Sequence, residues 1–231
     1  MIACNESNTT AMDSLRETAD EAMMARCVAL SRIAVGKGEY PFGTVIALDG
    51  QILAEAINHT VRDGDVTRHA EVIALSQAQK AIGREQLRHY TLYTNIEPCA
   101  MCSYCIREAW IGRVVYALSS PVMGGFSKWN ILRDDDISGR MPQIFANVPE
   151  VVSGVLAREA QQAWRDWNPL AWQMIKLRGL LTEPPCPYHD HVHVRPAHSR
   201  SLWHYLQILL ERTRQSRVET QAPDAQENSH L

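Results

Sequence analysis

Residues of the types that bind zinc occur in two short stretches, and a glutamate stands beside one of them. His69 precedes Glu71 by two positions, and Cys99, directly after Pro98, precedes Cys102 by three. Because residues three apart lie on the same face of a helical turn, both thiolates can reach one metal ion. One imidazole and two thiolates make three protein ligands, whereas zinc normally takes four in tetrahedral geometry. The spacing therefore predicts a zinc site that keeps one position for water, as catalytic zinc sites do.

Such a site would supply a nucleophile, because zinc lowers the pKa of a bound water to about 7. At the start of a helix, Glu71 can approach the same water as His69. Deeper in a helix, two steps would turn the side chain away by roughly 200°. A carboxylate there can take a proton from the water and pass protons to a ring nitrogen and a leaving amine. We interpret Glu71 as the catalytic acid and base, in agreement with the H-x-E and P-C-x-x-C signature of zinc nucleobase deaminases.

The alternative is a closed structural zinc site, which needs a fourth protein ligand. Cys105 is the nearest candidate, because it follows Cys102 by three residues and could lie near the same helix face. A buried core cysteine is the more common role for such a residue. A structural site has no use for the carboxylate of Glu71, so the pattern favours a catalytic site.

Composition indicates a globular protein without an obvious polyanionic partner. The chain has 231 residues, of which 45% are hydrophobic and 21% charged, with a formal net charge of -3. Nucleic-acid-binding domains usually carry a clear basic excess, so nucleic acid is not the expected partner, although a local basic patch stays open. The start of the chain lacks the pattern of a secretory signal, and no stretch approaches the length of a membrane span. We expect a cytoplasmic location, where clustered cysteines favour metal binding over disulfides.

The hydrophobic pattern predicts alternating helices and strands. Apolar residues with a helical period predict a helix over 14–36. Asp49-Gly50 predicts a tight hairpin turn between strands at 42–48 and 51–57. The remaining pattern predicts helices over 69–82, about 98–110, 157–167 and 170–181, strands over 90–94, 112–118 and 151–155, and irregular stretches over 58–68 and 119–148, the second with a short helical turn at most. Each zinc-binding stretch thus opens a helix, whose N-terminus helps to keep a thiolate ionised.

Two regions follow from these elements. We expect one domain over residues 14–181, preceded by a disordered leader. Residues 182–231 form an appended segment, which begins with a proline- and histidine-rich linker over 182–198. An amphipathic helix is predicted over 201–217, before a polar tail. Alternate histidines in the linker predict weak, adventitious metal binding at most.

Several segments, in order along the chain, resemble the cytidine and deoxycytidylate deaminase-like superfamily. These segments are PFGTVIALDG (41–50), Asn58, RHAEVIAL (68–75), LYTNIEPCAMC (92–102) and IGRVVYA (111–117). The resemblance covers about residues 20–135 and is strongest to the branch of guanine deaminase, fungal cytosine deaminase and tRNA adenosine deaminases. It implies a three-layer α/β/α fold with a five-stranded mixed sheet, zinc as cofactor, and usually a dimer or higher oligomer.

The resemblance also implies contacts to a substrate ring. Phe42 lies in the segment that lines the base pocket, Asn58 matches an asparagine that hydrogen-bonds the base, and Asn95 stands in a wall of the pocket. Phe42 in the strand core and Asn58 in a turn are the alternatives. Phe126 and Trp129 are suited to stacking on a flat heterocycle, with core packing equally open.

Another acidic cluster has a weaker link to the family. Asp134, Asp135 and Asp136 lie in a region comparable with that of a proton-shuttling acidic residue in guanine deaminase. A run of three aspartates is more often a solvated turn.

The main interpretation is a hydrolase of C–N bonds in cyclic amidines that deaminates a small aminated heterocycle, such as a free nucleobase or nucleoside, and works as a homodimer. The alternative is a tRNA-specific adenosine deaminase with the same chemistry. A non-catalytic zinc-binding module is the third interpretation. The PFG segment and the serines after residue 118 depart from the pattern of the tRNA enzymes, which favours the small molecule.

Overall fold

The computed structural model describes residues 11–83 and 87–184, and all structural statements concern these. The elements are α1 (Ala11–Gly36), β1 (Gly43–Leu48), β2 (Gln51–Ile57), α2 (Thr60–Asp63), α3 (Ala70–Ile82), β3 (Thr91–Ile96), α4 (Ala100–Glu108), β4 (Arg113–Leu118), α5 (Asp135–Arg140), β5 (Glu150–Ser153), α6 (Ala157–Trp167) and α7 (Pro169–Leu177). The predicted leader, apart from its last three positions, and the predicted linker beyond residue 184, helix over 201–217 and tail lie outside the described residues. Among the described helices, none is both long and apolar enough to cross a membrane.

Five strands form one mixed sheet in the order β2-β1-β3-β4-β5. β1 pairs antiparallel with β2 and β3, whereas β3, β4 and β5 are parallel. At the hairpin, Asp49 and Gly50 have φ angles of 48° and 75°, the left-handed backbone that such a tight turn requires. The predicted α/β fold with a five-stranded mixed sheet is confirmed.

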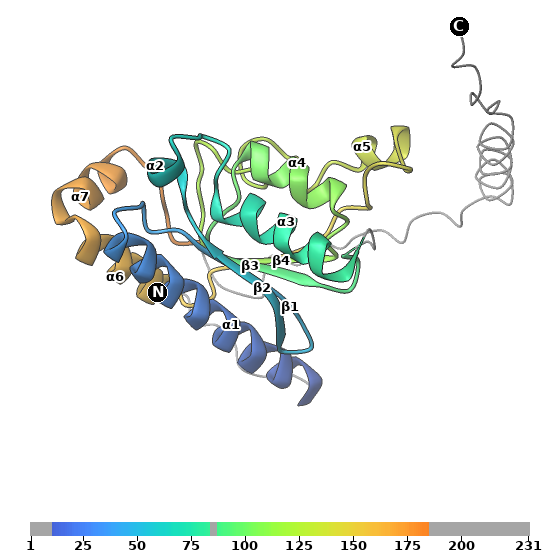
Figure 1. Cartoon of the computed structure of the whole chain (residues 1–231), viewed down its shortest axis with the longest axis horizontal. Coiled ribbons are helices and arrows are strands. Elements are labelled where there is room, and N and C mark those ends of the chain that lie inside the picture. Colours follow the sequence, from blue (N-terminus) through green and yellow to red (C-terminus); the bar gives the residue numbers. More distant parts are fainter. Residues whose placement is uncertain (1–10, 84–86, 185–231) are drawn as a thin grey trace, which may run out of the picture. The chain divides into compact units, whose positions relative to one another are not determined.

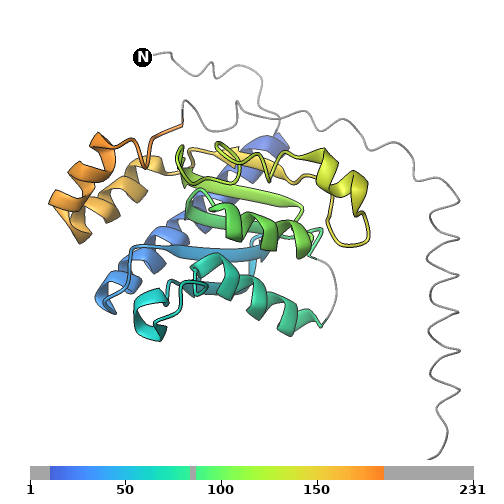
Figure 2. The same ribbon diagram turned by 90° about the horizontal axis from the view of Figure 1, so that it is seen from above.

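Helices cover both faces of this sheet. α3 and α4 lie on one face, and α1 and α6 lie on the other (Figures 1 and 2). β4 supplies both cores, because Val114 and Tyr116 pack on the α3–α4 side while Val115 and Ala117 pack on the α1–α6 side. The apolar run from Val114 to Leu118 is typical of a parallel strand buried on both faces.

A buried ion pair fastens α1 to the sheet. Asp20 on α1 accepts hydrogen bonds from both terminal nitrogens of Arg113 on β4, at 2.6 and 2.7 Å. The Tyr93 hydroxyl on β3 donates to the same carboxylate at 3.0 Å. Asp20 is only 1% exposed, so these contacts replace the water that the carboxylate loses on folding. The apolar period of the first helix does not reveal this pair.

The structure differs from the predictions at α2 and at the end of α7. Within the predicted loop over 58–68, α2 forms a short helix. The predicted helix over 170–181 ends at Leu177, because Gly179 adopts a left-handed backbone with φ 62°. The chain then turns back, and Thr182 exchanges two backbone hydrogen bonds with Ser119, at 2.9 and 3.0 Å. Residues just after α7 are thereby fastened beside the end of β4.

α1 passes β1 so closely that no side chain fits at Gly43. A Cβ at this position would lie 2.7 Å from the Cβ of Leu30 and 2.9 Å from the nitrogen of Ser31. It would lie closer still to the carbonyl oxygen of Cys27. The glycine of the PFG segment therefore sets the separation of helix and strand, and with it the position of the neighbouring Phe42.

We expect Gly43→Ala to lower the free energy of unfolding by about 1–3 kcal/mol, because α1 must move away from β1. Urea denaturation followed by circular dichroism measures this change. Gly36→Ala is the matched control, since a Cβ at Gly36 meets nothing within 4 Å. Equal stability of the two variants would contradict the close packing described.

Candidate active site

The two predicted zinc-binding stretches meet at the N-termini of α3 and α4. The Nδ1 atom of His69 lies 3.6 Å from the sulfur of Cys99 and 3.4 Å from the sulfur of Cys102. The two sulfurs are 3.6 Å apart. Zinc bonds of about 2.3 Å to sulfur and about 2.0 Å to nitrogen, at tetrahedral angles, separate ligand atoms by about 3.5–3.8 Å. The three side chains therefore fit a zinc ion, and they form the group of metal-binding side chains found among the described residues.

Electrostatics also favours a cation here. The hydrogen bond between Cys99 and Cys102, and more weakly the one between Cys99 and His69, lower the pKa of Cys99 to about 4, although burial opposes the shift. The resulting thiolate is the form of cysteine that binds metals. Its hydrogen bond and burial raise the pKa of Cys102, so the pair holds one proton that a divalent cation would displace.

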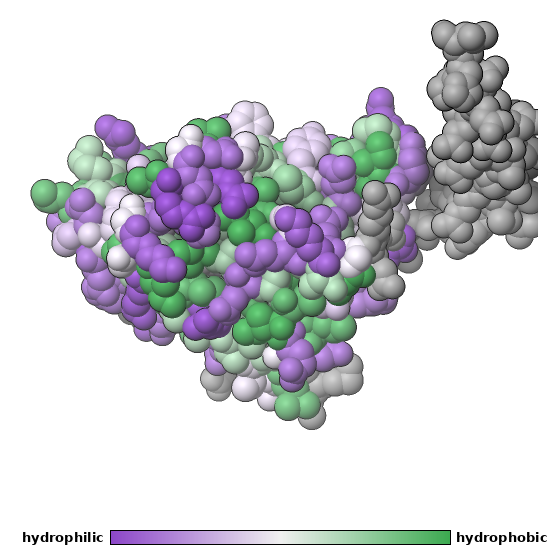
Figure 3. Space-filling model, in the orientation of Figure 1, coloured by the Kyte–Doolittle hydropathy of each residue, from purple (hydrophilic) through white to green (hydrophobic). Residues whose placement is uncertain are grey.

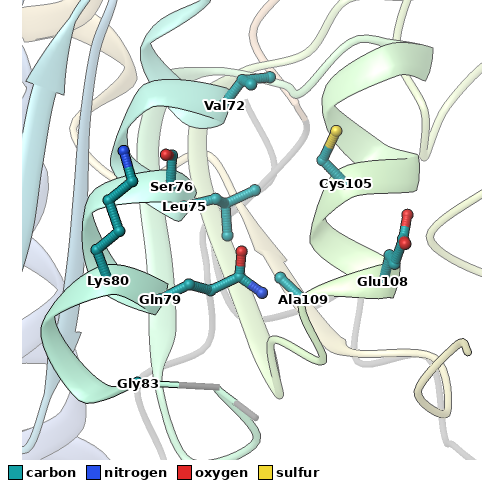
Figure 4. A pocket seen from close by; sticks show the side chains of 9 residues that line it. All are labelled: Val72, Leu75, Ser76, Gln79, Lys80, Gly83, Cys105, Glu108 and Ala109. Carbon is teal, nitrogen blue, oxygen red and sulfur yellow. The ribbon is translucent and has the colours of Figure 1, made fainter. Parts of the chain in front are cut away.

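Cys105 does not join this group. It is half-buried on the side of α4 that faces α3, where it lines a separate cavity of about 690 Å³ (Figure 4). The other residues around that cavity are Val72, Leu75, Ser76, Gln79, Lys80, Gly83, Glu108 and Ala109. The arrangement of the described residues thus does not support a closed site with Cys105 as fourth ligand.

Glu71 lies in the first turn of α3, beside the zinc-binding side chains. His69 precedes that helix with extended backbone, at φ -69° and ψ 148°, and this departure from helical geometry lets both residues face one cavity. Glu71 is 4% exposed. Its burial raises the pKa of the carboxyl to about 7.

A cavity of about 170 Å³ adjoins the zinc-binding side chains. Phe42, Asn58, His69, Glu71 and Cys99, five of the residues predicted from the sequence, line it together. Phe42 also packs edge-on against Trp164, with ring centroids 5.3 Å apart, so it serves both the core and the cavity.

Part of the wall comes from residues that the sequence analysis missed. Trp164 on α6, Ile175 on α7, and Leu180 and Leu181 just beyond α7 all line the cavity. In the sequence, their apolar side chains look like ordinary core positions of two C-terminal helices. The left-handed turn at Gly179 is the signal that could have redirected this segment toward the site.

Asn95 does not line this cavity. It is fully buried, its Oδ1 accepts a hydrogen bond from the Gly43 nitrogen at 3.0 Å, and its Nδ2 donates to the Pro41 carbonyl at 2.8 Å. The amide therefore clamps the segment that carries Phe42, one step behind the cavity wall.

The two predicted stacking residues also lie elsewhere. Phe126 packs in the core against Tyr116, with ring centroids 6.5 Å apart, and the guanidinium carbon of Arg133 lies 4.4 Å from its centroid. Trp129 is 56% exposed. Neither ring lines the cavity of Glu71, although Ser120 and Met123 of the same loop do.

Glu97 fixes that loop. Its buried carboxylate accepts hydrogen bonds from the backbone nitrogens of Ser120, Phe126 and Ser127, at 2.7, 3.0 and 2.6 Å, and from the Ser127 hydroxyl at 2.8 Å. A Cβ at Gly124 would overlap the carboxylate. Glu97 also lines the cavity of Glu71, and through these hydrogen bonds it organises the segment after β4.

The aspartate run belongs to the following segment. Asp134 caps α5 by accepting a hydrogen bond from the Asp136 nitrogen at 2.9 Å, and none of the three aspartates lines the cavity. Buried Arg107 on α4 donates to the carbonyls of Asp134, at 3.1 Å, and Ala146, at 3.0 Å. These bonds hold the irregular segment against α4.

Known proteins share this arrangement. The family model for the cytidine and deoxycytidylate deaminase zinc-binding region matches residues 17–118. The tRNA-specific adenosine deaminase of Bacillus subtilis (strain 168) is 34% identical over 144 residues, which are 62% of this chain and 84% of that relative. This chain belongs to the cytidine and deoxycytidylate deaminase family. It is thus a deaminase, a hydrolase with the zinc-binding His–Cys–Cys triad of the family.

Two further comparisons bear on this deaminase. A solved structure from a study of A-to-I editing by tRNA:A34 deaminases has a TM-score of 0.54 and 31% identity, covering 62% of this chain and 98% of that one. The tRNA(Ile)-lysidine synthase of Deinococcus radiodurans is 35% identical over 159 residues, 68% of this chain. The deaminase spans only 26% of that longer relative.

In this deaminase, we expect Cys102→Ala to abolish stoichiometric zinc binding, because two ligands do not retain zinc as three do. Cys105→Ala is the matched control, since Cys105 faces the other cavity, and it should keep one zinc per chain. Elemental analysis of the purified proteins after dialysis measures both. Loss of zinc from the Cys105 variant alone would overturn the ligand assignment.

Proposed function

We propose that this deaminase hydrolyses the exocyclic amino group from a purine or pyrimidine base and releases ammonia. One observation carries the proposal: a buried carboxylate, Glu71, shares a cavity of about 170 Å³ with the zinc-binding side chains. Sites that enclose a drug-sized molecule usually measure about 300–1,000 Å³. The smaller cavity suits a single ring system, with anything attached to the ring left outside.

Glu71 handles the protons in this proposal. Zinc, when bound by His69, Cys99 and Cys102, supplies an electrophilic centre that acidifies water. Glu71 accepts a proton as the oxygen of water bonds to the amino-bearing carbon, and it delivers a proton to the adjacent ring nitrogen. Glu71 then takes the proton of the new hydroxyl group and passes it to the amino group, so that the C–N bond breaks, a carbonyl forms and ammonia leaves. A carboxyl whose pKa burial raises to about 7 can perform both steps near neutral pH.

The named relatives support the adenine of an adenosine in tRNA as the base. The Bacillus subtilis relative, which this chain spans over 84% of its length, is named a tRNA-specific adenosine deaminase. The structure at 31% identity comes from a study of tRNA:A34 deaminases. On this support, we propose tRNA ahead of the small heterocycle that the sequence pattern favoured.

A free base is the second candidate, and the cavity wall favours it. Ile175, Leu180 and Leu181 form an aliphatic side of the cavity, and the Ser119–Thr182 pairing fastens this segment. Such a wall suits a compact ring more than a ribose and phosphates.

The charged side chains on the surface at α2 do not favour RNA binding there. Hydrophilic side chains gather over α2 on the face shown in Figure 3. There, Arg62 and Arg68 both pair with Asp63, at 2.7 and 3.1 Å, so this surface is of mixed charge. A uniformly basic stripe would be the usual signature of RNA binding. Homodimer formation and a cytoplasmic location stay predictions.

We expect Glu71→Gln to keep one zinc per chain but to lower the turnover number by about 10²–10⁴-fold, because the proton carrier is lost. Ammonia release measures turnover, and elemental analysis measures zinc. Glu159→Gln makes the same chemical change at an exposed position of α6 and should leave both unchanged. Full turnover by the Glu71 variant would refute the proton-transfer role.

Substrate choice is tested on the purified, zinc-loaded chain. One arm uses a tRNA with adenosine at the wobble position and detects inosine after digestion; the other measures ammonia release from adenine, cytosine and guanine. Inosine without release from free bases supports the tRNA function, and the reverse result supports the second candidate. Failure of every substrate would contradict base deamination.

A further inference from the structure

The side-chain amide of Asn58 has both of its donor hydrogens engaged by protein. Its Nδ2 donates to the Glu39 carboxylate at 2.9 Å and to the Thr60 hydroxyl at 2.7 Å. An amide nitrogen carries two hydrogens, so no donor remains for a ligand. Asn58 is 2% exposed and lines the cavity of Glu71. Its Oδ1 is therefore the one hydrogen-bonding atom of this side chain left to face a ligand.

The orientation of this amide is set by Glu39. The Glu39 carboxylate, itself 2% exposed, also accepts from the backbone nitrogens of Val61 at 3.1 Å and Arg62 at 2.7 Å. Burial raises the pKa of Glu39, but these donors and Asn58 outweigh it and lower the pKa overall. An ionised carboxylate only accepts hydrogen bonds. Turning the amide over would place Oδ1 against it, leaving two buried acceptors face to face.

From this geometry we infer that Glu39 is a positioning residue that presents Asn58 to the cavity as a hydrogen-bond acceptor, so the substrate must place an N–H or O–H donor there. The inference rests on the proposed function and deepens it. With the amide of Asn58 fixed, the cavity selects substrates that carry a hydrogen-bond donor at this point. A freely turning asparagine would bind a substrate with either a donor or an acceptor there.

Two substrates can carry this donor. In a free base, the ring nitrogen that would bear the sugar in a nucleoside is an N–H. In RNA that nitrogen is substituted, and the 2′-hydroxyl of the target nucleotide is the nearest donor that DNA lacks. In both cases the Oδ1 atom of Asn58 accepts a hydrogen bond from the substrate.

The first experiment compares matched substrates with the zinc-loaded full chain. Cytosine is compared with 1-methylcytosine, which lacks the ring N–H, and with 5-methylcytosine, which has equal bulk and keeps it. Adenosine at the wobble position of tRNA is compared with the 2′-deoxy nucleotide at the same position. Whichever substrate is turned over, we expect loss of the donor to lower kcat/KM by about 10- to 100-fold, because a buried acceptor is left unpaired.

Variants then test whether Glu39 causes this preference for substrates that carry the donor. Glu39→Gln should raise KM more than it lowers kcat and bring the ratio between donor and donor-free substrates toward one. Glu21→Gln, the same change at an exposed position of α1, should leave the ratio at the wild-type value. If Glu39 had a merely structural role, the Glu39→Gln substitution would lower the stability of the chain without changing the ratio. Equal turnover of donor and donor-free substrates by the wild-type chain, or an unchanged ratio in the Glu39 variant, would overturn the inference.

A second measurement is independent of turnover. In ¹⁵N-labelled full chain, the side-chain amide signal of Asn58 is identified by its loss in Asn58→Leu. Both amide protons should exchange slowly with solvent in the wild type, and at least one should exchange faster in Glu39→Gln. Fast exchange of both in the wild type would overturn the inference even if the proposed function failed with every substrate. Slow exchange in an inactive chain would leave the orienting role of Glu39 supported and the proposed function refuted.

Discussion

The convergence of two helix N-termini is the constraint on which the rest of the site depends. An imidazole nitrogen and two sulfurs from α3 and α4 lie 3.4–3.6 Å apart, and this separation is possible only if both helices start at the same point beside the sheet. The sheet supplies that point, because α3 packs on β1 and β2 while α4 follows β3. Gly43 sets the approach of α1 on the opposite face. A shift of about 1 Å between the starts of α3 and α4 would separate the ligand atoms beyond the reach of one ion.

Around the triad, buried carboxylates do most of the positioning. Glu97 fixes the loop after β4, and Glu39 fixes α2 together with Asn58. Asp20 fastens α1 through Arg113. Each carboxylate is buried and satisfied by several donors, since an unpaired charge in such a place would destabilise the fold by several kcal/mol. Glu71 differs from these three. Burial raises its pKa to about 7, and it faces a cavity in place of a set of donors.

The sequence predicted the parts of the fold and site that depend on local spacing. Strands and helices follow from hydrophobic periods of about 2 and 3.6 residues, the hairpin at Asp49-Gly50 from known turn chemistry, and the zinc triad from the spacing of its residues. The parts it missed depend on contacts between distant residues. Nothing local distinguishes Phe126 as a core ring or Asn95 as a clamp on Pro41 and Gly43. The wall formed by Leu180 and Leu181 depends on a turn at Gly179 and on pairing with Ser119, 63 positions before Thr182 in the chain.

The anchoring of the 119–129 loop limits which of its residues can be substituted independently of the rest of the chain. Glu97 occupies the interior of that loop, and Gly124 leaves no room beside its carboxylate for a side chain. Substitutions at the loop surface are independent of this core, whereas changes at Gly124 are coupled to changes at Glu97. A different loop grafted onto this chain therefore keeps the present shape only if it retains a glycine beside the Glu97 carboxylate. Glu97 and the loop therefore form one structural unit, although 26 positions of chain lie between Glu97 and Gly124.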